Sequence, residues 1–331
     1  MKVQDIGEQG LLRILQKFCP VEIVGDDCAV MATNPNQSIA ITTDMLVDGL
    51  HFSDRTTGPY YAGWRAAAAN LSDLAAMGAR PVGVTVALAV AADTAVEWVE
   101  EFYRGMTACL QEYHTPIVGG DVVRSPVVTV AIAAFGEVEC DRTIRRSNAR
   151  SNWAIVATGV HGASRAGLEL LLNPEFGQNL TEVDRASLIL AHQRPKPRLD
   201  VLRVVWEILD SAGEFSIAGM DSSDGLADAI IQICRASGVG AKVDRPKIPI
   251  PDIFSEIVST ETALDWALYG GEDFELVLFL PIANAELLVE QIGNGAQIVG
   301  IATDSTDIWL TDSSGIYPDS RLKLDRGFQH F

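Results

Sequence analysis

The sequence predicts an α/β (α+β) protein with two domains. The chain has 331 residues, 48% of them hydrophobic, so it can bury a large core, and its length suits about two domains. Two segments, Pro81–Ala91 and Val127–Phe135, alternate large and small uncharged residues with the period of two typical of strands. The apolar residues of Asp93–Tyr113, between them, recur at the spacing of an amphipathic helix.

The basic cluster Arg142–Arg150 is unusual in an acidic chain, and we place the domain boundary there. The expected domains are residues 1–148 and 149–331. The second domain is expected to continue the alternation of strands and helices, beginning with a strand at Trp153–Thr158. Arginines in this cluster suit a phosphate, although solvated charge at a linker explains some of them equally well.

Composition excludes several classes of function. The formal net charge is −19, which disfavours a nucleic-acid partner but leaves nucleotides open, since Mg²⁺ can bridge carboxylates to phosphates. The sequence contains no apolar run of roughly 18 residues, so a membrane span is not expected. No apolar signal region follows the first residues. The five scattered cysteines form no Cys-x-x-Cys pair, so we expect a reducing cytoplasm rather than zinc or disulfides.

Along the first half, polar residues repeatedly follow apolar runs. A helix at Gly10–Phe18 is followed by Gly25-Asp26-Asp27. The short strand Ile39–Ile41 is expected to end at Thr42-Thr43-Asp44, ahead of Asp48-Gly49 and His51. Hydroxyl and carboxylate oxygens at a strand end are ligands that Mg²⁺ prefers, although such residues also form ordinary turns.

The next two acidic positions lie on a helix and after a strand. An alanine-rich helix over Tyr61–Met77 carries Asp73, whose charge needs water, a donor or a metal. Thr94 and Glu97 match a capping box for the following helix. The apolar run Pro116–Val118 then leads into Gly119-Gly120-Asp121, where the glycines permit close backbone approach to a ligand, or form a plain turn.

The second half contains two further polar loops. Asp221-Ser222-Ser223-Asp224 precedes a helix at Ala227–Ser237, with Ser223 or Asp224 expected as its N-cap, and Gly270-Gly271-Glu272-Asp273 precedes a strand at Phe274–Leu280. The loop Gly159–Gly167 matches no phosphate-loop or dinucleotide-binding motif. His161 and His192 lack ligand spacing, and we interpret them as structural.

Taken together, these acids predict one pocket that holds several Mg²⁺ ions and a nucleoside triphosphate. The motifs Gly25–Ala29, Thr42–Asp44 with His51-Phe52, Asn70–Ala79, Gly119–Asp121, Ser223–Leu226 and Gly270–Asp273 resemble those of thiamine-monophosphate kinases. They occur in that family's order and cover nearly the whole chain. The Asn70–Ala79 and Gly270–Asp273 runs are the more specific ones.

The resemblance implies ATP-dependent phosphorylation of thiamine monophosphate to thiamine diphosphate by direct in-line transfer, with Mg²⁺ as the cofactor. It assigns metal contacts to Asp27, Thr42, Thr43, Asp44, Asp73, Asp121, Asp221 and Asp224. It assigns ATP contacts to Gly120, Asp121, Arg146 and Ser223, and substrate contacts to His51, Glu272 and an aromatic residue, Phe328. It also implies a homodimer in which the N-terminal sheets form a barrel.

Two departures and two rival functions accompany this resemblance. Ser151-Asn152 stands where the family usually has Gly-Asp, and Ala163 where an aspartate is common. One rival is another ATP-using enzyme of the same superfamily, such as the synthetase that cyclises a ribonucleotide. The other is a non-catalytic nucleotide-binding regulator, which only a turnover assay separates from an enzyme.

Overall fold

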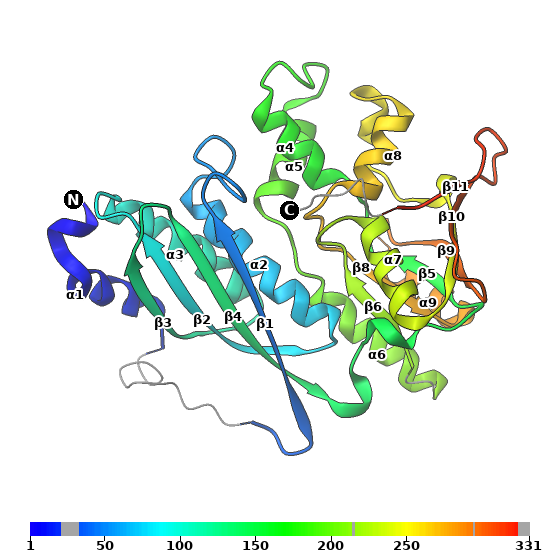
Figure 1. Cartoon of the computed structure of the whole chain (residues 1–331), viewed down its shortest axis with the longest axis horizontal. Helices are drawn as coiled ribbons and strands as arrows, with labels where there is room; N and C mark the ends of the chain where they lie inside the picture. The colour runs from blue at the N-terminus through cyan, green and yellow to red at the C-terminus, as the bar shows by residue number, and fades with distance from the viewer. Residues whose placement is uncertain (21–32, 214–215, 294, 324–331) are drawn as a thin grey trace. The chain divides into compact units, whose positions relative to one another are not determined.

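The computed structural model describes residues 1–20, 33–213, 216–293 and 295–323 (Figure 1). Packing divides the chain into two compact units: residues 1–74 with 79–140, and residues 75–78 with 141–331. The domain limits 1–148 and 149–331 stay a prediction, since packing alone does not show where an independently folding domain ends. Among the described residues, no helix has the length and apolarity needed to cross a membrane.

The first unit is a four-stranded mixed sheet with two long helices on one face (Figure 1). The strand order is β1-β4-β2-β3; β2 and β3 are parallel and the other pairs are antiparallel. Strands β1 and β3 are therefore the two edges of this sheet. The elements are α1 (Val3–Leu15), η1 (Gln16–Phe18), β1 (Gln37–Val47), α2 (Pro59–Ala76), β2 (Arg80–Val90), α3 (Val96–Glu112), β3 (Ile117–Arg124) and β4 (Thr129–Glu139).

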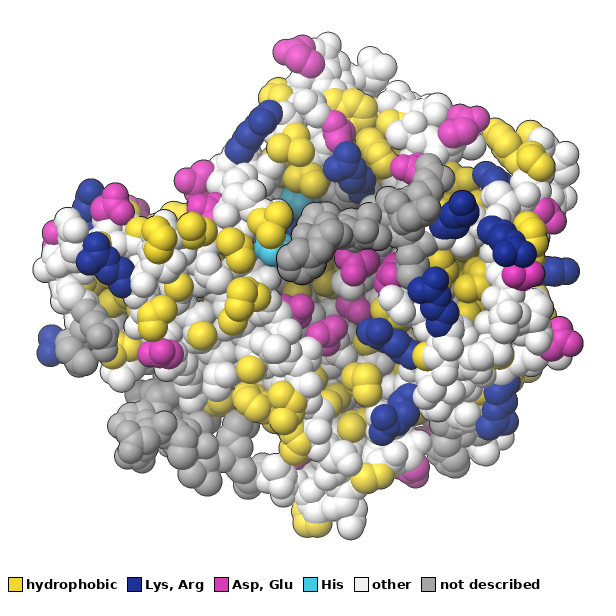
Figure 2. Space-filling model, in the orientation of Figure 1, with side chains coloured by type: hydrophobic (Ala, Val, Ile, Leu, Met, Phe, Trp, Pro, Cys, Tyr) yellow, Lys and Arg dark blue, Asp and Glu magenta, His cyan; other side chains and the backbone are white. Residues whose placement is uncertain are grey.

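The two faces of this sheet differ in burial. Val84, Val86 and Leu88 of β2 are fully buried on the helix face, where large apolar side chains pack on α2 and α3. On the other face of β1, Ile41 is 66% exposed and Met45 is 58% exposed. Hydrophobic side chains are spread across this open face (Figure 2). In the single chain, the helix face of this sheet is therefore covered and the face that carries Ile41 and Met45 is open.

Two predicted strand ends and one predicted cap are wrong. Thr42-Thr43-Asp44 lies inside β1 and Gly119-Gly120-Asp121 lies inside β3, because an edge strand tolerates polar residues and glycine on its exposed side. Helix α3 has Ala95 as its N-cap without a side-chain hydrogen bond, so Thr94 does not form a capping box. The Val96 N–H instead donates to Met1 O at 3.1 Å.

The second unit is a seven-stranded mixed sheet covered on both faces. Its strand order is β11-β10-β7-β9-β5-β8-β6. The strands are β5 (Ala154–Ala157), β6 (Ala218–Asp221), β7 (Gly240–Asp244), β8 (Leu276–Leu280), β9 (Gln297–Thr303), β10 (Ile308–Thr311) and β11 (Ser320–Arg321). The helices are α4 (Ala163–Leu172), α5 (Glu182–Gln193), α6 (Leu199–Ala212), α7 (Leu226–Ser237), α8 (Thr260–Tyr269) and α9 (Ile282–Ile292). Short 3₁₀ turns lie at Cys140–Arg142, Arg146–Asn148, Arg245–Lys247 and Asp252–Glu256.

Side chains of the central strands point alternately to the two faces of the sheet, and each face has its own hydrophobic core. Val277 and Phe279 of β8 pack with residues of α7 and α8, whereas Leu276, Leu278 and Leu280 pack with residues of α6 and α9. Every residue of β5 and β8 is buried, as expected for strands covered on both faces. These two strands are the rigid support for the loops that follow β5 and precede β8.

Helices α2 and α3 approach each other through glycines. A Cβ added at Gly105 would lie 1.7 Å from Tyr60 O, and one added at Gly63 would lie 1.9 Å from Phe102 O. No side chain fits at such distances, so these two glycines set how closely the helices pack. Helix α2 carries Asn70 and Asp73, and both of these side chains contact strand β1.

We expect Gly105→Ala to lower the melting temperature. Alanine in an open helix position would add about 1 kcal/mol of stability over glycine, but here the Cβ forces the helices apart, with a net loss of roughly 1–3 kcal/mol. Gly58→Ala, at the residue before α2, is the control for a glycine-to-alanine change without a clash, because a Cβ there meets nothing within 4 Å. Calorimetry of both variants checks this; an unchanged or higher melting temperature for Gly105→Ala would show that the helices have room to spare.

Candidate functional site

In the first unit, three predicted ligand residues lie on the helix face of the sheet. Thr42 and Asp44 alternate on that face of β1, and the Thr42 hydroxyl donates a hydrogen bond to Asp73 Oδ2 of α2. Asp73 is half-buried, so its carboxylate is not isolated in the core. One hydroxyl and two carboxylates therefore lie where β1 meets α2, and these are the hard oxygen donors that Mg²⁺ takes.

Asn70 braces this group, a role that the Asn70–Ala79 motif does not reveal from the sequence. Its side chain is fully buried in α2. Its Oδ1 accepts the Asp44 N–H at 3.2 Å, while its Nδ2 donates to Ala66 O at 3.0 Å. The Asp44 N–H faces away from the ladder at the sheet edge, so Asn70 supplies the acceptor that a neighbouring strand would otherwise provide.

Thr43 and Asp121 lie elsewhere. Thr43 faces the open side of the sheet, and its hydroxyl donates to Ile132 O at 2.9 Å. Asp121 is exposed on β3, the opposite edge, where its Oδ1 accepts the Val122 N–H at 2.9 Å. In the register of the sheet, Asp121 aligns with Ala87, Ala131 and Met45 on the open face. Gly120 precedes it, and its backbone packs closely on Val86 O.

His51 follows strand β1 in a tight turn. The Val47 N–H donates to His51 Nδ1 at 3.1 Å, which leaves the ring proton of the neutral imidazole on Nε2. The ring is half-buried. A fixed imidazole with an N–H at its outer nitrogen suits hydrogen bonding to an anionic substrate group.

In the second unit, Asp221 ends strand β6 and lies ahead of helix α7, and its side chain is buried. Ser222 is also buried, Ser223 is half-buried and Asp224 is exposed. The expectation that Ser223 or Asp224 caps α7 is wrong. The N-cap is Gly225 at φ 101°, a left-handed value that glycine adopts without strain.

The loop that carries Glu272 packs directly on this segment. The Glu272 N–H donates to Ser223 O at 2.8 Å, and a Cβ added at Gly271 would lie 2.6 Å from the same oxygen. Glu272 has φ 69° and Phe274 has φ 53°, both unusual for residues with side chains. The two predicted ligand loops of this unit are thus joined backbone to backbone.

Asp273 anchors the same loop to helix α4. Its carboxylate accepts the N–H groups of Gly162 at 2.6 Å and Ser164 at 2.9 Å, at the start of that helix. Burial raises the pKa of Asp273 to about 7, with the two N–H donors acting in the opposite direction. Ala163, the first residue of α4, lacks a carboxylate that the family commonly has there, but Asp273 satisfies this helix end from another loop.

Other polar groups complete the surroundings of Glu272. His192 is buried in α5, with Nδ1 at 3.6 Å from Glu272 Oε2 and 3.2 Å from the Ser164 hydroxyl. Ser151-Asn152 precedes β5, at the opposite end of that strand from the loop beginning at Gly159. Asn152 has φ 66°, which asparagine tolerates, so this departure from the family pattern lies away from the predicted ligand loops of the unit.

Three predicted site residues remain, namely Arg146, Asp27 and Phe328. Arg146 is exposed in a 3₁₀ turn, where its carbonyl accepts the Ser237 hydroxyl at 2.7 Å. Asp27 and Phe328 lie outside the described residues. Within residues 1–20, 33–213, 216–293 and 295–323, no three His, Cys, Asp or Glu side chains group closely enough to hold a metal. The predicted ligands are distributed over both units, and a common metal site stays a prediction.

Comparison with known families gives one domain match and close full-length relatives. The model for the AIR synthase related protein, N-terminal domain, matches residues 25–138. The thiamine-monophosphate kinase of Synechococcus elongatus is 47% identical over 331 residues, covering 99% of this chain and 98% of the relative. That of Escherichia coli K12 is 35% identical over 325 residues, covering 96% of this chain and 95% of the relative.

Solved structures with the same fold include two kinases. The thiamine-monophosphate kinase of Stenotrophomonas maltophilia aligns with TM-score 0.76 and 30% identity, covering 87% of this chain and 89% of that one. AaThiL complexed with AMPPCP and TMP aligns with TM-score 0.71 and 27% identity, covering 98% and 99%. The hydrogenase maturation protein HypE in complex with ATP, at 19% identity and TM-score 0.74, shares the fold.

Proposed function

We propose, from the premise that this chain belongs to the thiamine-monophosphate kinase family, that it phosphorylates thiamine monophosphate to thiamine diphosphate with ATP. A full-length relative with that name is 47% identical. A solved structure of the same fold holds an ATP analogue together with TMP. The observation that carries the proposal in this chain is the joined pair of loops, in which the Glu272 N–H donates to Ser223 O.

The proposed reaction is a direct in-line transfer. An oxygen of the thiamine monophosphate phosphate attacks the γ-phosphorus of ATP, the bond from that phosphorus to the β–γ bridging oxygen breaks, and ADP leaves with the oxygen. His51 offers its Nε2 proton to the substrate, and Glu272 offers a carboxylate that suits the cationic thiamine moiety. Phe328 is proposed as an aromatic contact.

Oxygen donors are proposed to hold Mg²⁺: Asp27, Thr42, Thr43, Asp44, Asp73, Asp121, Asp221 and Asp224. The hydroxyl and carboxylates of Thr42, Asp44 and Asp73 fit the donor chemistry of that ion. When bound, Mg²⁺ would neutralise charge on the phosphate oxygens. The proposed ATP contacts are Gly120, Asp121, Arg146 and Ser223. A cytoplasmic location is proposed from the scattered cysteines.

The geometry of the first sheet favours a dimer with shared sites. Asp44 and Asp121 lie on opposite edges, three strand spacings or about 14 Å apart, and on opposite faces. In a two-fold barrel of eight strands, the β3 edge of one copy would lie beside the β1 edge of the other. The β3 strand that carries the partner's Asp121 would then lie beside the β1 strand that carries Asp44, and the exposed apolar face of Ile41 and Met45 would be covered.

We expect purified protein with ATP and Mg²⁺ to convert thiamine monophosphate to thiamine diphosphate, followed by chromatography of the products. A protein that forms no thiamine diphosphate but cyclises formylglycinamidine ribonucleotide would be another synthetase of the superfamily. A protein that binds Mg·ATP yet turns over no acceptor would be a regulator. Either result would contradict the proposed function.

We expect Asp73→Asn to lower the rate at least about a hundredfold, or roughly 3 kcal/mol, because asparagine keeps the shape but loses the charge at the phosphates. The melting temperature without metal should hold or rise, since nearby carboxylates repel one another. Asp304→Asn, in an exposed loop, is the control. A large fall in melting temperature with near-normal turnover at saturating Mg²⁺ would instead make Asp73 a structural acid.

Shared sites predict complementation between inactive variants. Asp73→Asn and Asp121→Asn chains, co-expressed with different tags and purified through both, should form heterodimers with one intact site and about half of the wild-type rate. Each homodimer alone should be inactive. Light scattering that gives the monomer mass of 35.6 kDa would refute the dimer. An inactive heterodimer would show that each chain uses its own Asp121.

A further inference from the structure

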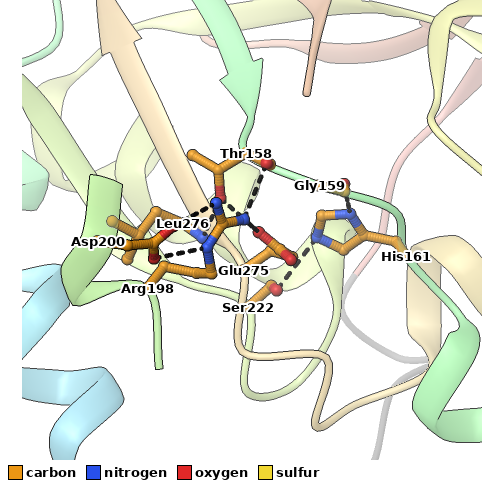
Figure 3. A network of polar contacts seen from close by, with 8 residues as sticks. All are labelled: Thr158, Gly159, His161, Arg198, Asp200, Ser222, Glu275 and Leu276. Carbon is orange, nitrogen blue, oxygen red and sulfur yellow. Dashed lines mark hydrogen bonds and ion pairs between the residues drawn. The ribbon is translucent and has the colours of Figure 1, made fainter. Parts of the chain in front are cut away.

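Ser222 is the fixed point of the loop between β6 and α7. Its side chain is fully buried, between the buried Asp221 and the half-buried Ser223. Its N–H donates to Glu275 O at 2.8 Å, and its hydroxyl lies 3.1 Å from His161 Nε2 (Figure 3). One residue of the loop is therefore held at both its backbone and its side chain.

The direction of the His161–Ser222 hydrogen bond follows from the other ring nitrogen. His161 Nδ1 lies 3.1 Å from Gly159 O, and a carbonyl only accepts, so Nδ1 carries the proton. Nε2 then has a lone pair and accepts the Ser222 O–H. The ring is fully buried, and burial lowers the pKa of His161 to about 4, so the imidazole is neutral near pH 7.

Further hydrogen bonds fix the residues on both sides of the His161–Ser222 contact. The backbone N–H of His161 donates to Pro249 O at 2.9 Å. On the other side of Ser222, the Glu275 carboxylate accepts the Thr158 hydroxyl at 2.6 Å and pairs with Arg198, whose Nη1 also donates to Thr158 O at 2.9 Å (Figure 3). These contacts join the end of β5 to the start of β8.

We propose that His161 is a positioning residue, which holds Ser222 by accepting its hydroxyl proton and so fixes the directions of Asp221, Ser223 and Asp224. This inference rests on the proposed function, because those three residues are its metal and nucleotide contacts. It replaces the purely structural role expected from the sequence. The same loop also accepts the Glu272 N–H at Ser223 O, so a displaced Ser222 would disturb the substrate loop as well.

Two substitutions of His161 test the roles of its two ring nitrogens separately. His161→Gln places an acceptor near the Nε2 position and should keep Ser222 in place. His161→Asn places a donor near the Nδ1 position, which keeps the contact with Gly159 O but loses Ser222. We expect the Mg²⁺ concentration for half-maximal rate to rise about five- to tenfold in His161→Asn, the value of one hydrogen bond, and to change about twofold or less in His161→Gln.

Ser222→Ala tests the same hydrogen bond from its other side, in case the His161 variants fail to fold. It removes the hydroxyl with little change in side-chain volume. It should match His161→Asn in its Mg²⁺ dependence. Equal effects of the glutamine and asparagine variants, or wild-type Mg²⁺ dependence in Ser222→Ala, would overturn the proposal. A fall in melting temperature alone would do the same.

Calorimetric binding of Mg·ATP to each variant keeps this test independent of turnover. If the wild type binds Mg·ATP but makes no thiamine diphosphate, the proposed function fails, and the affinity ranking of the variants still decides the role of His161. Weaker Mg·ATP binding in His161→Asn and Ser222→Ala than in His161→Gln supports the positioning role. Identical affinities for all three variants contradict it.

Discussion

Backbone N–H groups outside the regular strand ladders need acceptors, and the placement of the acidic side chains depends on how this need is met. At the edge of β1, Asn70 accepts the Asp44 N–H. In the second unit, Glu275 O accepts from Ser222 and Ser223 O accepts from Glu272. An unpaired buried N–H costs about as much as a lost hydrogen bond, so these contacts fix the loops before any ligand arrives.

The sequence predicted the residues near the candidate site better than it predicted their local structure. Asp73 lies on a predicted helix, and Asp221–Asp224 precedes another predicted helix, because period and composition identify buried elements well. Thr42-Thr43-Asp44 does not end β1, since an edge strand keeps its ladder on one side whatever its exposed residues are. Local patterns also missed the cap of α7, where backbone geometry selects Gly225 over the neighbouring Ser223 and Asp224.

Contacts between residues far apart in the sequence could not be predicted from local sequence patterns. His161 meets Ser222 across 61 positions, and Glu275 meets Thr158 across 117. Their only local signal is polarity near the end of an apolar strand, which fits turns equally well. Glu272, Asp273 and Glu275 are three acids close together in the sequence, and a residue far along the chain offsets part of their charge. Burial raises the pKa of Glu275, and Arg198 opposes that shift.

The left-handed backbone at Glu272 limits which side chains this position tolerates, whatever the carboxylate binds. Its φ of 69° suits glycine, asparagine and aspartate, and it strains valine, isoleucine and threonine because their branched Cβ crowds the backbone. A library of variants at residue 272 would therefore separate by backbone shape first and by charge second. Asparagine, which keeps the turn and removes the charge, is the informative member of such a library.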